Sequence, residues 1–462
     1  MPTEIHLLDP SEETSSETAS LADGFTRSGS PVPRKRWRAW LAQPSFSQAP
    51  LSMIDQTIVS GTSFLTTLVI GRICGAEELG IYSLAFTLIV LATNLQTAVF
   101  STPYTIYANR LNGRARQEYA GSVLLHCLIL TAVTSIVLAL VAIGMILMRS
   151  DYQYVSLIWI LVLTMPLVLL REFVRRFAFA HLRISVVLAL DIVVSAIQLG
   201  GLWLLVVTER VSTNHVYLLM GVACAIAGGG GLAVLKEGFA FRLESVLPEL
   251  RKSWQLGRWI AATRAMVIVQ TYAVYWLLAI AMGTAATGVY TASMTLLLAA
   301  NPFVIGIGNI LEPKAALAIA NGGIHQLRSV VWRATQLLGG VMGLFCGLLF
   351  FSGGWLVNLL YSGSEYENQG PTVAVLALAV LVNACETGVT HGLRVLERPD
   401  LSFKASLLSL GITLVVAMLL IRPLGTLGGA CAVLAGDTAA AVVRWVAFSR
   451  LSMLMLSRAE GK

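Results

Sequence analysis

The sequence predicts an all-α polytopic membrane protein with about twelve transmembrane helices in two six-helix lobes. Of its 462 residues, 56% are hydrophobic and only 12% are charged, whereas about 25% of residues in soluble proteins are charged. The mean hydropathy is +0.75. Segment 75–82, Gly-Ala-Glu-Glu-Leu-Gly-Ile-Tyr, returns 208 positions later as segment 283–290, Gly-Thr-Ala-Ala-Thr-Gly-Val-Tyr. A membrane protein that repeats itself at half its length is typically a transporter with two related lobes.

Each predicted lobe consists of apolar segments long enough to cross a bilayer. A helix needs roughly 20 residues to cross about 30 Å of hydrocarbon. Because six spans separate the two copies of the repeat, both lobes enter the membrane in the same direction, and we expect a pseudo-two-fold axis along the membrane normal. The twelve spans are predicted near residues 51–72, 79–102, 121–147, 154–173, 184–207, 214–236, 259–282, 286–311, 330–356, 371–391, 403–421 and 424–448.

Shifts in composition give the domain boundaries. Residues 1–45 are rich in Ser, Thr, Glu and Pro, which predicts a disordered cytoplasmic tail, and residues 450–462 are predicted to form a second cytoplasmic tail. The lobes are predicted at 46–236 and 258–449. Between them, segment 237–257 mixes large apolar and charged side chains, which is typical of an amphipathic helix on the inner leaflet. We expect this segment to connect the lobes.

The basic residues predict the orientation, because Lys and Arg are retained on the cytoplasmic side during insertion. With the spans above, 27 of the 32 Lys and Arg residues fall on one side, and only Arg72, Arg149, Arg210 and Arg422 fall on the other. Arg264 lies inside a span. We therefore expect a multi-pass protein of the inner (cytoplasmic) membrane with both termini in the cytoplasm.

Several classes of function lack their sequence signatures. The chain has no GxxxxGK[ST] phosphate loop, and no Ser/His/Asp or paired-carboxylate arrangement stands out. Its six cysteines and six histidines show no ligand spacing, so no metal or other cofactor is expected. The basic excess is explained by membrane topology and anionic lipids, and it indicates no nucleic-acid partner. A transporter is therefore favoured over an enzyme.

Three segments resemble a known family. Residues 72–85, followed by Tyr107-Ala-Asn-Arg110, resemble the opening hairpin of polysaccharide and O-antigen flippases in the multidrug/oligosaccharidyl-lipid/polysaccharide (MOP) exporter superfamily. Residues 283–292 are similar to the family's seventh and eighth helices, and Leu396-Glu-Arg-Pro-Asp-Leu401 to its loop between helices ten and eleven. The resemblance implies export of an isoprenoid-diphosphate-linked oligosaccharide from the inner to the outer leaflet by alternating access.

The implied partners are this lipid-linked oligosaccharide, membrane lipids, a coupling ion (H⁺ or Na⁺) and glycan-assembly proteins. A lipid diphosphate needs cationic groups and polar or aromatic walls inside the bilayer. Arg264 lies about six residues into span seven, and Gln270, Tyr272 and Tyr275 continue that span as candidate lining. The alternative for Arg264 is that its side chain extends to the inner headgroups.

Further cationic candidates lie at the ends of spans. Arg171 and Arg175 share a helix face near the end of span four, where they either collect a diphosphate or anchor the span by ordinary positive-inside placement. Arg72, at the outer end of span one, either takes part in substrate release or contacts headgroups.

Four carboxylates fall within predicted spans, where an unpaired charge is costly. Asp55 is expected to pair with Arg264 between the lobes when the inner gate is shut, with a structural salt bridge as the alternative. Asp191 and Glu386 are candidates for proton or sodium coupling. Asp437 is expected to form a packing pair with Arg444 on span twelve.

Two other functions remain compatible with the sequence. A drug or metabolite-cation antiporter of the same superfamily would share the lobes but would favour an acidic, aromatic cleft. A non-transporting membrane component of a glycan-synthesis complex would use its intramembrane charges only for packing.

Overall fold

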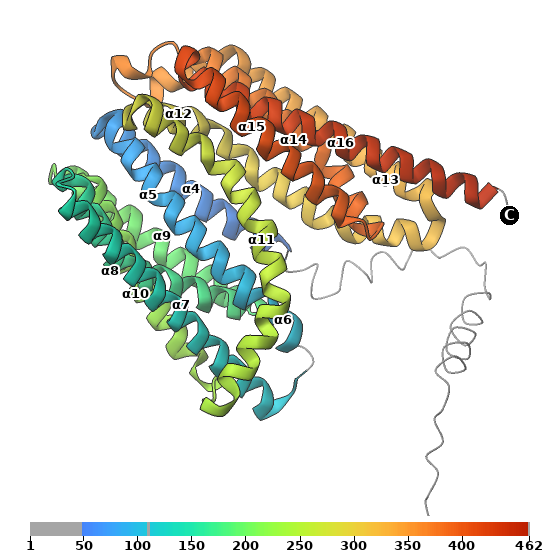
Figure 1. Ribbon diagram of the computed structural model, residues 1–462, viewed down its shortest axis with the longest axis horizontal. Coiled ribbons are helices and arrows are strands. Elements are labelled where there is room, and N and C mark those ends of the chain that lie inside the picture. The colour runs from blue at the N-terminus through green and yellow to red at the C-terminus, as the bar shows by residue number, and fades with distance from the viewer. Residues whose placement is uncertain (1–48, 109–110, 461–462) are drawn as a thin grey trace, which may run out of the picture. The chain divides into compact units, whose positions relative to one another are not determined.

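The computed structural model of the chain describes residues 49–108 and 111–460, which are almost entirely helical (Figure 1). The predicted tail at 1–45 lies outside the described residues. The N-terminal lobe contains α4 (Ala49–Ile73), α5 (Gly75–Gln96), the π-helical turn η1 (Thr97–Ser101), α6 (Thr102–Ala108), α7 (Gly113–Leu147), α8 (Tyr152–Ala180), α9 (Ile184–Val207) and α10 (Thr213–Leu235).

The short turn η2 (Lys236–Gly238) leads into the C-terminal lobe. This lobe contains α11 (Leu243–Met282), α12 (Thr284–Leu297), η3 (Leu298–Ala300), α13 (Asn301–Leu360), η4 (Ser364–Tyr366), α14 (Gly370–Val395), α15 (Pro399–Leu424) and α16 (Thr426–Glu460). The predicted all-α, two-lobe fold class is therefore confirmed.

The candidate membrane spans correspond closely to the predicted ones. Among the described residues, ten helices are long and apolar enough to cross a membrane. Helix α12 with η3 passes the same test only together with the first turns of α13, from which it is bent by 44°, and this pair counts as an eleventh span if it crosses as one unit. Helix α4, at the first predicted span, has 25 residues but is not among these, and it carries Asp55, Gln56 and several Ser and Thr side chains.

Two helices differ from the predicted boundaries. Helix α11 is continuous over 40 residues, so most of the expected connector and span seven form a single helix. The assignment of 237–257 as an inner-leaflet connector stays a prediction. Helix α13 contains a break at Gly322 and Gly323, where Gly323 has a φ of +60° that glycine adopts without strain. This break separates the predicted spans eight and nine.

Close packing within the N-terminal lobe fixes the position of α8. This helix packs against α7 and α10, with Leu161 and Met165 fully buried in the apolar core. Gly228 of α10 lies so close to α8 that an added Cβ would be 3.2 Å from the backbone nitrogen of Arg171. The charged end of α8 is therefore held rigidly against the bundle.

The two copies of the repeat contact each other directly, and α12 runs beside α5 (Figure 1). A Cβ added to Gly80 would lie 1.9 Å from the carbonyl oxygen of Thr284, and one added to Gly288 would lie 1.8 Å from that of Ala76. These reciprocal contacts agree with a two-fold relation between the lobes. They also show that both helices begin at the same end of the molecule.

The first glycine of each repeat ends one helix and begins the next. Gly75 has a φ of +86° and Gly283 a φ of +90°, values that side chains with a Cβ rarely adopt. The same backbone turn therefore precedes α5 and α12, which explains why glycine stands at this position in both copies.

A second contact joins the lobes at this end. In the segment between α13 and α14, the Tyr366 hydroxyl donates to the carbonyl oxygen of Gly71 at 3.0 Å. Glu365 accepts from the backbone N–H of Ala76 at 3.3 Å. By the predicted orientation this is the outer end of the molecule, so the lobes are joined there through α4, α5, α12 and this segment.

Candidate functional site

The four carboxylates predicted within the spans fall into two separate groups, one in each lobe. In the N-terminal lobe, Arg175 of α8 donates to Asp55 of α4 at 2.8 Å and to Asp191 of α9 at 2.7 Å. Arg171, one turn earlier, also pairs with Asp191. Asp191 is fully buried and Asp55 is 1% exposed, so these carboxylates depend on the two arginines for charge compensation.

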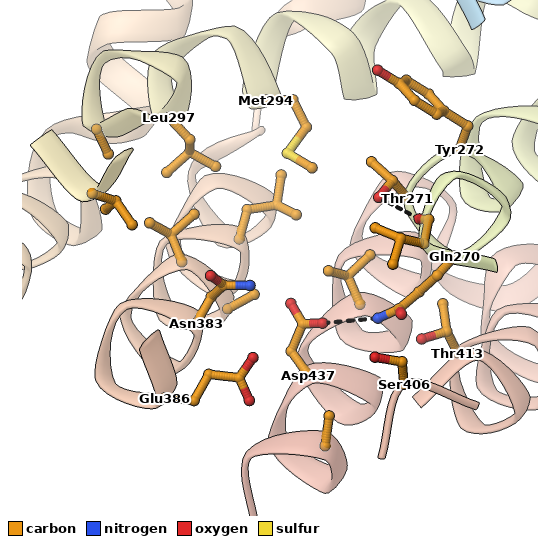
Figure 2. A pocket seen from close by; sticks show the side chains of 18 of the residues that line it. Gln270, Thr271, Tyr272, Met294, Leu297, Asn383, Glu386, Ser406, Thr413 and Asp437 are labelled. Carbon is orange, nitrogen blue, oxygen red and sulfur yellow. Dashed lines mark hydrogen bonds between the residues drawn. The ribbon is translucent and has the colours of Figure 1, made fainter. Parts of the chain in front are cut away.

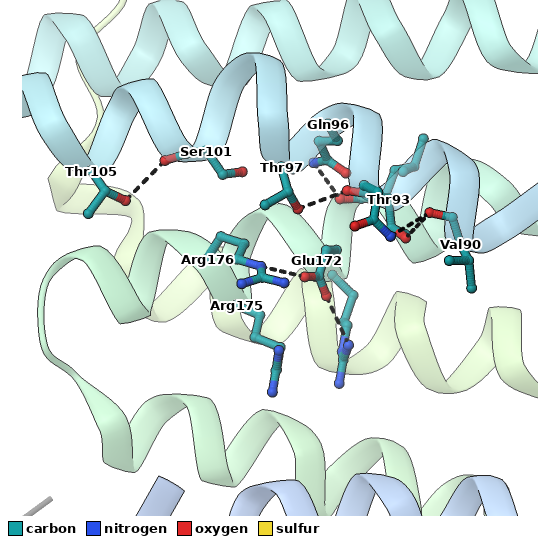
Figure 3. Close-up of polar contacts among 12 residues, drawn as sticks. Val90, Thr93, Gln96, Thr97, Ser101, Thr105, Glu172, Arg175 and Arg176 are labelled. Atoms are coloured by element: carbon teal, nitrogen blue, oxygen red, sulfur yellow. Dashed lines mark hydrogen bonds and ion pairs between the residues drawn. The ribbon is translucent and has the colours of Figure 1, made fainter. Parts of the chain in front are cut away.

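Glu172 completes this N-lobe ion cluster. Its carboxylate accepts from Arg176 at 2.7 Å and from Arg171 at 3.3 Å. Figure 3 shows Arg175 pointing away from Glu172. The cluster has three carboxylates and three guanidinium groups, so its formal charge is zero. Its members are Asp55, Arg171, Glu172, Arg175, Arg176 and Asp191.

The pairing of Asp55 differs from the expectation. Asp55 contacts Arg175 of its own lobe, while Nη1 of Arg264 lies 3.5 Å from Oδ1 of Asn94. The expected Asp55–Arg264 pair is thus not formed among the described residues, and for the state with the inner gate shut it stays a prediction. Asp191 is engaged by two arginines, which is the arrangement of a structural ion pair.

A signal for the Asp191 contacts was present in the sequence. Helices α8 and α9 form a hairpin whose turn lies at 181–183, and residues at equal distances from such a turn face each other. Arg171 and Asp191 are equidistant from residue 181, and Arg175 and Asp191 from residue 183. The contact with α4 has no such signal, because α4 lies far from α8 in the sequence.

One arginine from each lobe acts electrostatically on Arg264, and we call the three residues the interlobe arginines: Arg176, Arg264 and Arg394. Arg264 of α11 is exposed, and the charges of Arg176 on α8 and Arg394 on α14 both act on it. The Arg176 side chain is 42% exposed despite its pair with Glu172. Among the described residues Arg264 has no carboxylate partner, and repulsion from the other two guanidinium groups favours binding of an anion beside it.

Polar residues of α5 adjoin this region. Asn94 contacts Arg264 from the opposite lobe, and Gln96 donates to the carbonyl oxygen of Leu169 at 3.0 Å. The following π-helical turn packs closely on α11, because a Cβ at Gly257 would lie 2.8 Å from the Cα of Val99. Single π-helical turns occur often at functional sites. Figure 3 shows the polar side chains of this stretch facing α8.

The C-terminal lobe contains a cavity of about 490 Å³, which we call the C-lobe cavity (Figure 2). Gln270 of α11 donates to Ser409 of α15 at 2.6 Å and to Asp437 of α16 at 3.1 Å. Tyr272 and Tyr275 line the same space. Gln270 therefore holds three helices of the lobe together at the wall of the cavity.

The charges of this cavity are not matched. Arg444 pairs with Glu386 and donates to Ser406 at 2.7 Å. Asp437 accepts from Gln270, is repelled by Glu386 and is attracted by the charge of Arg444 without an ion pair. The charged residues that line the cavity are thus two carboxylates and one guanidinium. The predicted Asp437–Arg444 pair makes no direct ion pair among the described residues: Arg444 contacts Glu386 of α14, while its charge still acts on Asp437.

Uncompensated acceptors also face this space. Oε2 of Glu386 and Oγ1 of Thr413 are buried without a hydrogen-bond partner, and both residues line the cavity. In Figure 2, Asn383 lies on the side of Asp437 opposite Gln270. Oxygen atoms of carboxylate, amide and hydroxyl groups are the ligands that small hard cations prefer. The cavity is chemically suited to take up a proton or a small cation.

The remaining predicted residues occupy different places. Arg72 is exposed in the last turn of α4, at the end that the predicted orientation places outside. Gln270, Tyr272, Tyr275 and Glu386 meet in the C-lobe cavity. The rotation of each helix determines where a polar side chain points, and the spacing of charges alone does not encode it. For this reason the following residues were not selected as site residues from the sequence: Arg176, Arg394, Asn383, Thr413 and Asp437.

Comparison with known proteins places the chain by fold. No family model matches the sequence, and no curated protein matches it by sequence. The structure is similar to an inward-facing multidrug resistance MATE family transporter of the MOP superfamily, with a TM-score of 0.72 and 12% identity over 87% of this chain and 96% of that one.

Two other solved structures have the same fold. The lipid II flippase MurJ in an inward closed conformation has a TM-score of 0.67 and 12% identity, covering 88% of this chain and 90% of that one. A MOP superfamily transporter from Pyrococcus furiosus has a TM-score of 0.65 and 13% identity, covering 88% of this chain and 96% of that one. The chain therefore has the multi-pass membrane fold of MOP-superfamily transporters. These neighbours are transporters and flippases rather than enzymes.

Proposed function

We propose that this protein carries an isoprenoid-diphosphate-linked oligosaccharide from the inner to the outer leaflet by alternating access. The observation that carries this proposal is the group of interlobe arginines. They come from both lobes, and Arg264 has no carboxylate partner among the described residues. A diphosphate between the lobes would relieve their repulsion and engage both lobes at once. The structural similarity to the lipid II flippase MurJ supports this substrate class.

The other predicted residues fit around this group. Arg171 and Arg175 belong to the N-lobe ion cluster, so we assign them to positioning α8, and with it Arg176, rather than to direct substrate binding. Arg72 is proposed to contact headgroups or departing substrate at the outer end. We infer an inner-membrane location with cytoplasmic termini, since this places most basic residues inside.

The C-lobe cavity supplies the proposed energy coupling. Binding of H⁺ or Na⁺ at Asp437 would compensate the unmatched carboxylate, with Glu386 and Thr413 close by. Asp191, which was also predicted to couple, lies in a charge-balanced cluster that offers no such imbalance. The acidic, tyrosine-lined cavity equally favours the second candidate function, a drug or metabolite-cation antiporter, and the similarity to MATE transporters supports that alternative.

Reconstituted transport distinguishes the two functions. Proteoliposomes containing the full chain are tested with a fluorescent isoprenoid-diphosphate oligosaccharide and, separately, with a fluorescent organic cation. We expect flipping of the first, with at least a tenfold loss in Arg264→Gln and little change in Arg333→Gln, an exposed arginine of α13. Uptake of the organic cation without flipping of the lipid would establish the antiporter instead.

A further inference from the structure

A cationic cavity lies in the N-terminal lobe, and none of the interlobe arginines lines it. It has a volume of about 370 Å³ and is formed by the start of α7, the end of α8 and the α10–η2 junction. The predicted orientation places all three segments at the cytoplasmic surface. We call it the α7 cavity. Its lining residues are Gly113, Arg116, Gln117, Phe177, His181, Arg183, Val234, Leu235 and Gly238.

The charge of the α7 cavity is not compensated by its walls. The charges of Arg116 and Arg183 both act on His181, and none of the lining residues is acidic. Neither arginine forms an ion pair with a described residue, in contrast to the arginines of the N-lobe ion cluster. Nε of Arg116 is buried and has no hydrogen-bond acceptor, although its guanidinium group lies beside the Tyr104 hydroxyl.

The surroundings of His181 favour its neutral form at this site. Nδ1 donates to the carbonyl oxygen of Phe177 at 2.9 Å, and Nε2 faces the Tyr104 hydroxyl at 3.5 Å. Burial, together with Arg116 and Arg183, lowers the pKa of His181. The standing charge of the cavity therefore comes from the two arginines.

The start of α7 adds to the positive potential. This helix has 35 residues, and its N-cap, Asn112, makes no hydrogen bond from its side chain to the first turn. The first N–H groups of such a helix are available to an anion, and the helix dipole favours negative charge there. Gly113 and Arg116 of this first turn both line the cavity.

Exposed apolar groups border the same site. Val234 lines the cavity and is 66% exposed, and Leu182, between His181 and Arg183, is 68% exposed. A ligand with a phosphate group beside a hydrocarbon chain would satisfy both features. A free phosphate ion would use only the charged part.

From this geometry we propose that the α7 cavity binds the phosphate headgroup of an anionic phospholipid of the cytoplasmic leaflet. Arg116, Arg183 and the first turn of α7 hold the phosphate, and the acyl chains lie over Val234 and Leu182. The site is separate from the interlobe arginines, so it does not depend on the transported substrate.

The test is a titration of the purified full chain in detergent with phosphatidylglycerol, followed by native mass spectrometry. Each arginine near an anionic surface contributes about 1 kcal/mol, so Arg116→Gln and Arg183→Gln should each weaken binding by about fivefold. Arg114→Gln is the matched control, since Arg114 lies in the same turn but is exposed and paired with Glu118. We expect Arg114→Gln to bind phosphatidylglycerol with the affinity of the parent chain.

Two competing ligands show which part of the lipid is recognised. Phosphatidylcholine should bind much more weakly, and glycerol 3-phosphate should compete poorly, because it lacks acyl chains. Equal affinity for all three arginine variants, or competition by glycerol 3-phosphate at the concentration of the lipid, would overturn the proposal. If the Gln variants fail to fold, Arg116→Lys provides the test, since it keeps the charge and should retain most of the binding.

Discussion

Helices α5 and α12 cross in close contact at Gly80 and Gly288. A larger side chain at this crossing is predicted to change the conformation of the protein. With a leucine at position 288, Cβ would start 1.8 Å from the carbonyl oxygen of Ala76, whereas carbon and oxygen atoms in close contact are about 3.3 Å apart. Helices α5 and α12 must therefore separate by about 1.5 Å at this point. Such overpacking costs about 1–3 kcal/mol, and only the state in which the helices cross carries this cost.

In an alternating-access cycle, this cost shifts the population toward the state with the outer ends apart by about 5–150-fold. The shift is measurable as the distance between spin labels at the outer ends of the two lobes. Tyr152 and Ser362 are suitable sites because both are exposed, and the six native cysteines are first replaced. We expect longer distances and slower flipping in Gly288→Leu than in the parent chain.

Gly200→Leu is the matched control, because Gly200 is exposed in α9 and an added Cβ meets nothing within 4 Å. Its label distances should equal those of the parent chain. Unchanged distances in Gly288→Leu would refute the reasoning, since the crossing would then tolerate a side chain. Longer distances with undiminished flipping would show that separation of α5 and α12 at this crossing does not limit transport.

Three other outcomes follow from the charged sites. Arg175→Gln leaves two buried carboxylates without their shared partner and should lower stability by about 3–5 kcal/mol in thermal unfolding, while the half-exposed Arg176→Gln should cost below about 1 kcal/mol. Asp437→Asn should make flipping insensitive to imposed proton and sodium gradients. Because its pKa is lowered, His181 is mainly neutral at about pH 7 and gains a positive charge as the pH falls toward about 5. Phosphatidylglycerol binding should therefore strengthen as the pH falls, and His181→Phe should abolish that response.

The fold was largely predictable because the membrane imposes a simple length rule. Apolar segments of about 20 residues with charged residues between them leave few alternatives, and the repeat supplied the relation between the lobes. The boundaries of α11 and α13 were harder to predict, because hydropathy does not distinguish one continuous helix from two consecutive helices. Gly322 and Gly323 mark the break in α13, but adjacent glycines also occur in unbroken helices, as at Gly229 and Gly230 of α10.

The types of residue in the candidate site could be predicted from the sequence, but their hydrogen-bond and ion-pair partners could be predicted only in part. Buried charges are costly in a span, so Asp55, Asp191 and Glu386 could be selected from the sequence alone. Their partners depend on which helix faces which. Asp437 was assigned to Arg444 on its own helix, yet two turns of separation place these groups about 10 Å apart along the axis, and each found a nearer partner on another helix.

The two lobes share a fold but differ in how their charges are arranged, and this difference suggests how coupling works. The N-lobe ion cluster is charge-balanced and its carboxylates are buried, so it favours a rigid lobe, whereas the C-lobe cavity has two carboxylates and one guanidinium. Gln270, which binds Asp437, lies six residues after Arg264 on the same helix, about 9 Å along its axis. We therefore expect a change in the charge of Asp437 to act on the helix that carries Arg264.

Linkage makes this connection reciprocal, because a substrate that changes ion affinity must have its own affinity changed by the ion to the same extent. Ion affinity is measured with and without a soluble isoprenoid diphosphate, and we expect the diphosphate to shift it in the parent chain. The shift should disappear in Arg264→Gln and persist in Arg333→Gln. A shift that survives in Arg264→Gln would mean that the ion acts through another helix, for which α15 is the candidate, since Ser409 also binds Gln270.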